Sequence, residues 1–282
     1  MQHIEFLDRS HFELNYHRIP APVELSHFID FFWETNFDHL WKQHPEGFSD
    51  VLFANTGYTY LINLGTPFVM QVGEKKFDMR TDGYLPRHRT LECFHQKDNR
   101  LFGIKFRVSP ILFIKEINFS EYREYIFPLS YLLDALVIDQ IKTAGSFSAR
   151  VDVLTAYFNS IILENSNKQQ PVTIVTTIMT DCDRKNDFNI SIEELASQYG
   201  ISSRTLQRYF ETCTGIGSKP ALQVMRIRKA TEQLVNSPGD FHYSKYGYYD
   251  YSHFSKHLRS FLKINEQHRR NLHLEILAQS GK

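Results

Sequence analysis

The chain has 282 residues, of which 42% are apolar and 23% are charged. This length suits one large domain or two domains with separate cores, and this composition excludes extended disorder. No apolar run is long enough to cross a bilayer and the first ten residues carry no secretion signal, so we expect a cytoplasmic protein without a membrane partner. The widely spaced Cys93, Cys182 and Cys213 form no CxxC pair, which predicts buried thiols rather than disulfides or a zinc site.

Charge is distributed unevenly along the chain although it sums to zero. Residues 1–171 carry 17 Lys and Arg against 21 Asp and Glu, a net charge of −4, whereas residues 172–282 carry 15 against 11, a net charge of +4. This pattern indicates an acidic module followed by a basic one.

The first hundred residues predict short strands separated by turns. Residues 101–110 alternate most clearly, with one face formed by Phe102, Ile104, Phe106 and Val108 and the other by Lys105 and Arg107. Such alternation is typical of a strand that is buried on one face only. Closely spaced strands with Gly and Pro turns predict a small barrel or sandwich.

From Ser109 onward the apolar spacing becomes helical. The helix expected around residues 148–164 carries a narrow apolar seam, formed by Val151, Leu154, Phe158 and Ile161. Two helices from different subunits share seams of this kind, which predicts a homodimer, and packing of the helix on its own domain is the alternative.

The polar segment 165–171, NSNKQQP, ends in proline and predicts a linker. The chain would then divide into domains at 1–164 and 172–282, and we expect the second to fold by itself. The expected fold class is α+β, with a small β-barrel and helices first and an all-α domain second.

Residues 190–210 predict a helix, a glycine turn and a second helix. Ser191 and Glu194 form a capping box at the start of the first helix. Ala196 supplies a small side chain where the two helices cross, and Gly200 permits the backbone of the turn. This is the layout of a helix-turn-helix unit.

The second of these helices would present a polar face suited to DNA. Ser202 is expected to cap it, which leaves Ser203, Arg204, Gln207 and Arg208 pointing outward. Arg makes a bidentate contact with guanine, Gln pairs with adenine, and Ser hydroxyls reach phosphate. The pattern therefore predicts a helix that enters the major groove, and an ordinary solvated helix face is the alternative.

A long helix over residues 218–235 then leads to a second glycine turn and helix. The combined pattern resembles the AraC/XylS family of bacterial transcription regulators, whose DNA-binding domain joins two helix-turn-helix units by a long helix. The residues that carry the resemblance are Ala196, Gly200, Ile201, Ser202, Leu206, Gln207, Arg208, Tyr209, Phe210, Thr214, Gly215, Arg226, Ala230, Gly247, Tyr248, Asp250, Ser252, His253 and Phe254.

The resemblance implies double-stranded promoter DNA as the partner, with RNA polymerase and a small-molecule effector as further partners. It implies no enzymatic activity, catalytic residue, metal or cofactor. The base-contacting residues of the first unit would be Arg204, Gln207 and Arg208. Those of the second would be Tyr251, Ser252, His253, Ser255 and Lys256.

The sequence departs from the family pattern in the second unit. Gly217 and Ser218 replace the family's Ser-Pro, and Glu266 replaces a later Pro. Tyr243 stands where the family places an alanine, four residues before Gly247. A tyrosine does not fit a close helix crossing, so we expect the first helix of this unit to be shortened or displaced.

The first domain resembles, through residues 20–33 and 101–110, the cupin-like sensory domain that precedes many AraC-type domains. Cupin enzymes hold a metal with clustered histidines and a glutamate, so His88, Glu92 and His95 are candidates. On a strand, His95 would face away from the other two and the close HxH pair is absent, which favours a domain without a metal. Aromatic residues that could line a pocket, and more often form a core, are Tyr58, Tyr60, Phe68 and Tyr84.

The hypothesis is a transcription regulator with a sensory and dimerisation domain at 1–164 and a DNA-binding domain at 172–282. One alternative is a metal-dependent cupin enzyme fused to a DNA-binding domain, which elemental analysis would indicate. Another is a degenerate helix-turn-helix domain that binds protein, which genomic footprinting would separate from a regulator.

Overall fold

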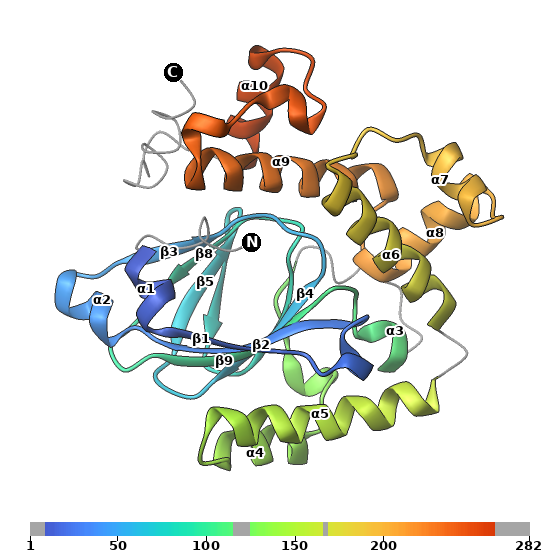
Figure 1. Ribbon diagram of the computed structural model, residues 1–282. Coiled ribbons are helices and arrows are strands. Elements are labelled where there is room, and N and C mark those ends of the chain that lie inside the picture. Colours follow the sequence, from blue (N-terminus) through green and yellow to red (C-terminus); the bar gives the residue numbers. More distant parts are fainter. Residues whose placement is uncertain (1–8, 115–124, 166–168, 263–282) are drawn as a thin grey trace.

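The computed structural model describes residues 9–114, 125–165 and 169–262 (Figure 1). Antiparallel strands dominate the N-terminal half, and helices form the C-terminal half. The predicted two-part α+β architecture is therefore confirmed.

The strands form two antiparallel sheets. The six-stranded sheet has the order β1-β2-β9-β4-β7-β10, with bounds Tyr16–Pro20, Ile29–Asn36, Arg100–Phe106, Tyr58–Asn63, Gly83–Pro86 and Phe127–Pro128. The four-stranded sheet has the order β3-β8-β5-β6, with bounds Ser49–Leu52, Leu91–Phe94, Phe68–Val72 and Lys75–Met79.

Along the chain the strands alternate with α-helices and with short 3-10 helices, which are labelled η. In the N-terminal half they are α1 Arg9–Leu14, η1 Val23–Leu25, α2 Asp38–Gln43, α3 Ile111–Ile114, η3 Leu129–Tyr131, α4 Ala135–Thr143 and α5 Phe147–Glu164. In the C-terminal half they are α6 Gln169–Lys185, α7 Ile192–Gln198, α8 Ser203–Thr214, α9 Ser218–Asn236, η5 Pro238–Asp240, η6 Tyr243–Tyr246 and α10 Tyr251–Leu262. None of the described helices is long and apolar enough to cross a membrane.

A hydrophobic core lies between the two sheets, built from residues of both, among them Trp33, Leu61, Phe68 and Leu101. This core corrects the expectation that β9 is half-buried. Every residue of β9 after Arg100 is buried, because the four-stranded sheet covers the face that was expected to meet solvent. Lys105 is only 9% exposed, and its ammonium group donates to the Thr56 carbonyl at 2.8 Å.

A second core covers the other face of the six-stranded sheet. Tyr58, Tyr60 and Tyr84 are buried within it, and Tyr58 stacks on Tyr84 at a centroid distance of 5.1 Å. The aromatic side chains therefore form core, as the sequence favoured, and Phe68 is likewise buried between the sheets.

Helix α5 packs its apolar seam into this second core. Val151, Leu154 and Phe158 are buried, and the Phe158 ring lies 5.6 Å from Phe28 and 5.4 Å from Phe106. Packing on its own half explains the seam, so the expectation that the seam joins two subunits is wrong. Homodimer formation by another surface stays a prediction.

Helix α6 begins at Gln169, inside the segment that was predicted as a linker. Pro171 lies in the first turn of this helix, where the missing amide hydrogen removes no intrahelical bond. The proline that suggested a linker therefore marks the start of a helix.

The two halves share buried contacts. The Ser109 amide donates to the Cys213 carbonyl at 2.6 Å. Arg228 of α9, 2% exposed, donates to the carbonyls of Phe53 at 3.3 Å and Ala54 at 3.0 Å. Helices α6, α8 and α9 thus lie directly against the strand-rich half (Figure 1).

Candidate nucleic-acid interface

The first helix-turn-helix unit consists of α7, a turn and α8. The Ser191 hydroxyl accepts from the Glu194 amide at 3.0 Å, as the predicted cap requires. Ala196 is 1% exposed at the helix crossing, and Gly200 has φ +62°, a conformation that glycine adopts without strain. The predicted cap, crossing and turn are all present.

Helix α8 separates an inner from an outer face. Leu206 and Phe210 are fully buried, whereas Arg204 and Arg208 are exposed and lie one turn apart. The Ser202 hydroxyl caps the helix by accepting from the Thr205 amide at 3.1 Å. A cationic pair therefore stands near the N-terminus of a capped helix, where backbone amides favour an anion such as phosphate.

Gln207 differs from its predicted outward orientation. Its carbonyl oxygen accepts from the Ser218 amide at 3.2 Å and the Ser218 hydroxyl at 2.9 Å. Its amide nitrogen donates to Glu211 at 3.0 Å. Because the N-cap of α9 is Gly217, which has no capping side chain, Gln207 takes the role of cap for that helix.

The second unit keeps the helix that follows its glycine turn, α10, but has only a short 3-10 turn before that glycine. η6 covers Tyr243–Tyr246, where the family pattern has a full helix. Tyr243 is half-buried, with its ring 6.3 Å from that of Tyr251. This first helix was expected to be shortened or displaced, and it is shortened.

Helix α10 presents a polar face to solvent. The Asp250 carboxylate caps it by accepting from the His253 amide at 2.7 Å. The predicted residues Tyr251, Ser252, His253 and Lys256 are exposed, and Ser255 is half-buried. Arg259, which no sequence motif singled out, is also exposed and follows Lys256 at the helical spacing of three residues.

A hydrogen-bonded cluster fixes the second unit to the first. Asn189, before α7, donates to the Gly247 carbonyl at 2.8 Å and accepts from Arg226 of α9 at 2.6 Å. The Arg226 guanidinium also lies 4.3 Å from the centre of the Tyr248 ring. These contacts therefore tie the turn before α10 to α9 and to the segment that precedes α7.

His257 and Tyr248 extend this cluster into α10. The Tyr248 hydroxyl lies 2.8 Å from Nδ1 of His257. Burial raises the pKa of Tyr248 to about 12. Burial, together with the charges of Arg226 and His253, lowers the pKa of His257 to about 4, so His257 is neutral at pH 7.

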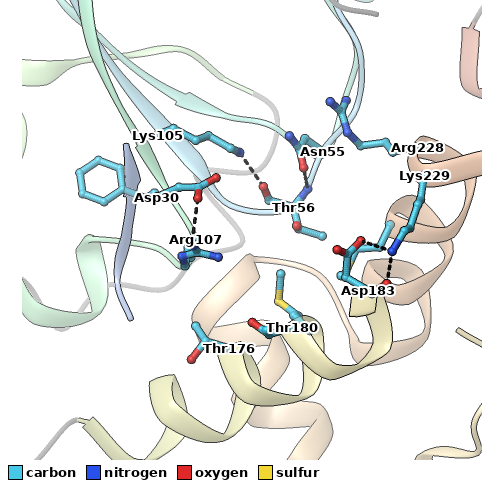
Figure 2. A pocket seen from close by; sticks show the side chains of 13 residues that line it. Asp30, Asn55, Thr56, Lys105, Arg107, Thr176, Thr180, Asp183, Arg228 and Lys229 are labelled. Atoms are coloured by element: carbon cyan, nitrogen blue, oxygen red, sulfur yellow. Dashed lines mark hydrogen bonds and ion pairs between the residues drawn. The ribbon is translucent and has the colours of Figure 1, made fainter. Parts of the chain in front are cut away.

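A cavity of about 150 Å³ lies between the strand-rich half and helices α6 and α9 (Figure 2). Its charged lining residues are four cationic and two acidic side chains, namely Lys105, Arg107, Arg228, Lys229, Asp30 and Asp183. Arg107 pairs with Asp30 at 2.8 Å, and Lys229 pairs with Asp183. The surplus of positive charge suits an anionic ligand.

The candidate metal ligands His88, Glu92 and His95 do not form one cluster among the described residues. Glu92 accepts from the Ser49 hydroxyl at 3.1 Å, whereas His95 points between the sheets. Within the described parts of the chain, His95 shares a cluster with Asp50 and Cys93 and not with His88 or Glu92. The three cysteines are buried, as expected.

No family model matches the sequence, and no curated protein matches it. Solved structures do. ToxT from Vibrio cholerae O395 is 10% identical with a TM-score of 0.44, covering 95% of this chain and 98% of that chain. ToxT from Vibrio cholerae strain SCE256, solved with an unsaturated fatty acid bound, is 10% identical with a TM-score of 0.40, covering 89% and 91%.

The AraC-like transcriptional activator CuxR is 8% identical with a TM-score of 0.25, covering 84% of this chain and 93% of that chain. Each of these TM-scores lies below 0.5.

Proposed function

We propose that this chain is a transcription regulator of the AraC type, which binds promoter DNA through α8 and α10. The observation that carries the proposal is the exposed pair Arg204 and Arg208 on a capped helix after a glycine turn. An arginine in this position reaches O6 and N7 of a guanine in the major groove. The exposed Lys256 and Arg259 add positive charge on α10.

The test is DNA binding by the full-length protein. Sequences selected from a random pool would be compared for the parent, Arg204→Ala and Arg208→Ala proteins by fluorescence anisotropy. Loss of either arginine should cost about 1–3 kcal/mol of binding free energy and relax the preference at one base pair. Arg80→Ala is the matched control, because Arg80 is an exposed arginine of the strand-rich half.

If the folded protein binds no duplex even at low salt, the DNA-binding proposal fails. Footprinting in the cell then tests the alternative that the helix-turn-helix domain binds protein instead of DNA. That alternative predicts that no genomic site is protected. Sedimentation of the full chain would establish whether a homodimer forms at the concentrations at which it binds DNA.

We further infer that an anionic small molecule acts as effector at the cavity between the halves. Lys105 on β9 and Arg107 directly after β9 line this cavity on one side, and Lys229 of α9 lines it on the other (Figure 2). Organic acids that raise the melting temperature of the parent protein should raise it less in Lys229→Ala. Lys185→Ala is the control, since Lys185 is exposed at the end of α6 and does not line the cavity. Equal shifts in both variants would contradict this location.

A further inference from the structure

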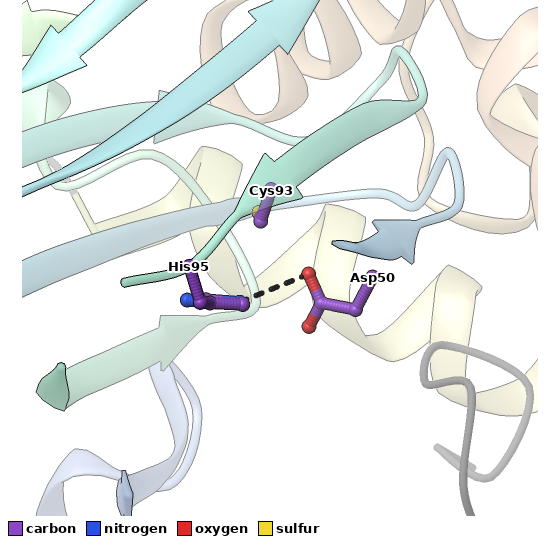
Figure 3. A group of neighbouring side chains, drawn as sticks. All are labelled: Asp50, Cys93 and His95. Carbon is purple, nitrogen blue, oxygen red and sulfur yellow. Dashed lines mark hydrogen bonds and ion pairs between the residues drawn. The ribbon is translucent and has the colours of Figure 1, made fainter. Parts of the chain in front are cut away.

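A compact polar cluster lies inside the strand-rich half, apart from the cationic face of α8. It consists of Asp50 on β3, Cys93 on β8 and His95 just beyond β8 (Figure 3). Each residue is at most 3% exposed. One donor atom from each residue lies within 4.8 Å of the other two. All three residues also line a cavity of about 50 Å³ between the sheets.

Strand pairing explains why the three side chains meet. Asp50 and Cys93 are directly opposite each other in the antiparallel β3–β8 pair, so their side chains leave the sheet on the same face. His95 lies two residues after Cys93 and therefore shares that face. The arrangement is fixed by backbone register rather than by flexible loops.

The hydrogen bonds of Asn99 determine how the His95 ring is protonated. The Asn99 amide nitrogen donates to the Thr66 carbonyl at 2.9 Å, which orients the amide group. Its oxygen therefore faces Nδ1 of His95 at 2.7 Å and accepts the hydrogen of that nitrogen. In the neutral ring, Nε2 then carries a lone pair.

That lone pair faces a carboxylate. Nε2 of His95 lies 3.2 Å from Oδ1 of Asp50. Two acceptors at this distance repel each other unless a positive species lies between or beside them. The candidates are a proton on His95, which forms an ion pair, and a metal ion held by both groups.

The donor set favours a metal of intermediate softness. Imidazole nitrogen, thiolate sulfur and carboxylate oxygen all bind zinc at about 2.0–2.3 Å. Tetrahedral donors at those lengths are separated by roughly 3.5 Å, close to the observed Nε2–Oδ1 distance. The cavity beside them has room for a water molecule as the fourth ligand.

The surroundings hold the histidine ring in place for this role. Phe37 stacks on His95 at a centroid distance of 3.6 Å, and Phe68 lies on it at 5.3 Å. A ligand histidine that donates its second nitrogen hydrogen to a polar oxygen has a fixed ring orientation and stronger basicity. Asn99 supplies that oxygen here.

We propose that Asp50, Cys93 and His95 bind one zinc ion between the two sheets. Binding converts the Cys93 thiol to a thiolate and releases its proton to solvent. Asn99 is a positioning residue that acts through His95. The ion ties β3 to the end of β8, independently of any contact with DNA. The sequence favoured a domain without a metal, because spacing along the chain does not reveal that Asp50, 43 residues before Cys93, lies opposite it in a strand pair.

The test uses the full-length protein, freed of metal with a chelator and titrated with Co²⁺ as a spectroscopic probe for zinc. We expect one equivalent to bind, with a thiolate-to-cobalt charge-transfer band and the intense visible bands of tetrahedral cobalt. Zn²⁺ should displace it with loss of both signals. A folded parent protein that shows neither band would overturn the proposal and leave the buried ion pair as the explanation.

Substitutions distinguish the residues that bind the metal from those that only lie near it. Cys93→Ser should abolish the charge-transfer band, and Asn99→Ala should weaken zinc affinity about 10–100-fold while the band remains. Cys182→Ala, which removes a buried thiol far from the cluster, should match the parent. If Cys182→Ala loses the band and Cys93→Ser keeps it, the site is elsewhere. If Asn99→Ala binds zinc as tightly as the parent, its assigned positioning role is wrong.

Discussion

At the scale of single residues, three neighbouring polar side chains of α8 differ in what they contact. Arg204 and Arg208 are exposed, whereas Gln207 turns toward the start of α9 and accepts from the Ser218 amide. Helical periodicity predicts the direction in which each Cβ atom leaves the helix. It does not predict which long side chain will bend to hydrogen-bond the free amides at the start of a neighbouring helix. Gly217 gave a local signal, since a helix that starts after glycine needs its cap from another segment.

Gln207→Ala should therefore reduce stability rather than alter base preference. Removal of the side chain leaves the Ser218 amide without its cap, which should lower the free energy of unfolding by about 0.5–2 kcal/mol. Urea denaturation measures this loss, and Thr212→Ala on the same helix serves as a control. If Gln207→Ala instead keeps full stability and relaxes preference at an A·T pair, then Gln207 reads DNA.

His257 should make stability depend on pH. Its pKa is lowered from 6.5 to about 4 in the folded protein, so between these values the unfolded chain binds a proton that the folded chain does not. The free energy of unfolding should therefore fall as the pH drops from about 6.5 toward 4. His257→Gln should lose less stability than the parent between pH 7 and pH 5 in urea denaturation. An identical loss in the parent, His257→Gln and the exposed control His17→Gln would assign the dependence to other groups.

At the scale of elements, sequence was reliable where a local rule decides the outcome. A large ring at position 243 predicted a shortened or displaced first helix, and this segment forms only the 3-10 turn η6. Sequence patterns failed where contacts with distant segments determine the structure. Alternation in β9 did not reveal the second sheet that buries Lys105, and the seam of α5 did not reveal which surface it meets.

The shortened first helix changes what α10 is expected to do on DNA. With only η6 supporting it, α10 presents Lys256 and Arg259 rather than a closely spaced arginine pair near its start. Lys256→Ala should weaken binding to all sequences about equally and reduce the salt slope by about one unit, as a lost phosphate contact does. Anisotropy across a salt series measures this slope. If Lys256→Ala instead erases preference at particular base pairs, α10 reads bases directly.

At the scale of the whole molecule, the sequence predicted two parts but not how firmly they meet. The net charge changes sign across the predicted linker, the apolar spacing becomes helical from Ser109 onward, and strands do give way to helices along the chain. The contacts that join the halves depend on pairs such as Ser109 with Cys213 and Phe53 with Arg228. These partners are more than a hundred residues apart, so no local pattern could indicate them.

This shared surface leads us to expect that the halves recognise each other as separate chains. Residues 1–167 and 168–282, expressed together, should co-purify because separation would expose Arg228 and the Phe53–Phe261 ring contact to water. Arg228→Glu should abolish co-purification, since a carboxylate cannot donate to the carbonyls of Phe53 and Ala54 and would be buried beside them. Arg184→Glu, at an exposed position on α6, should leave co-purification intact.

Fragment 168–282 should also unfold at a lower urea concentration than the full chain, because its surface loses the apolar partners that the strands provide. A fragment that is as stable as the full chain and does not bind the other half would show that the two parts are independent in solution.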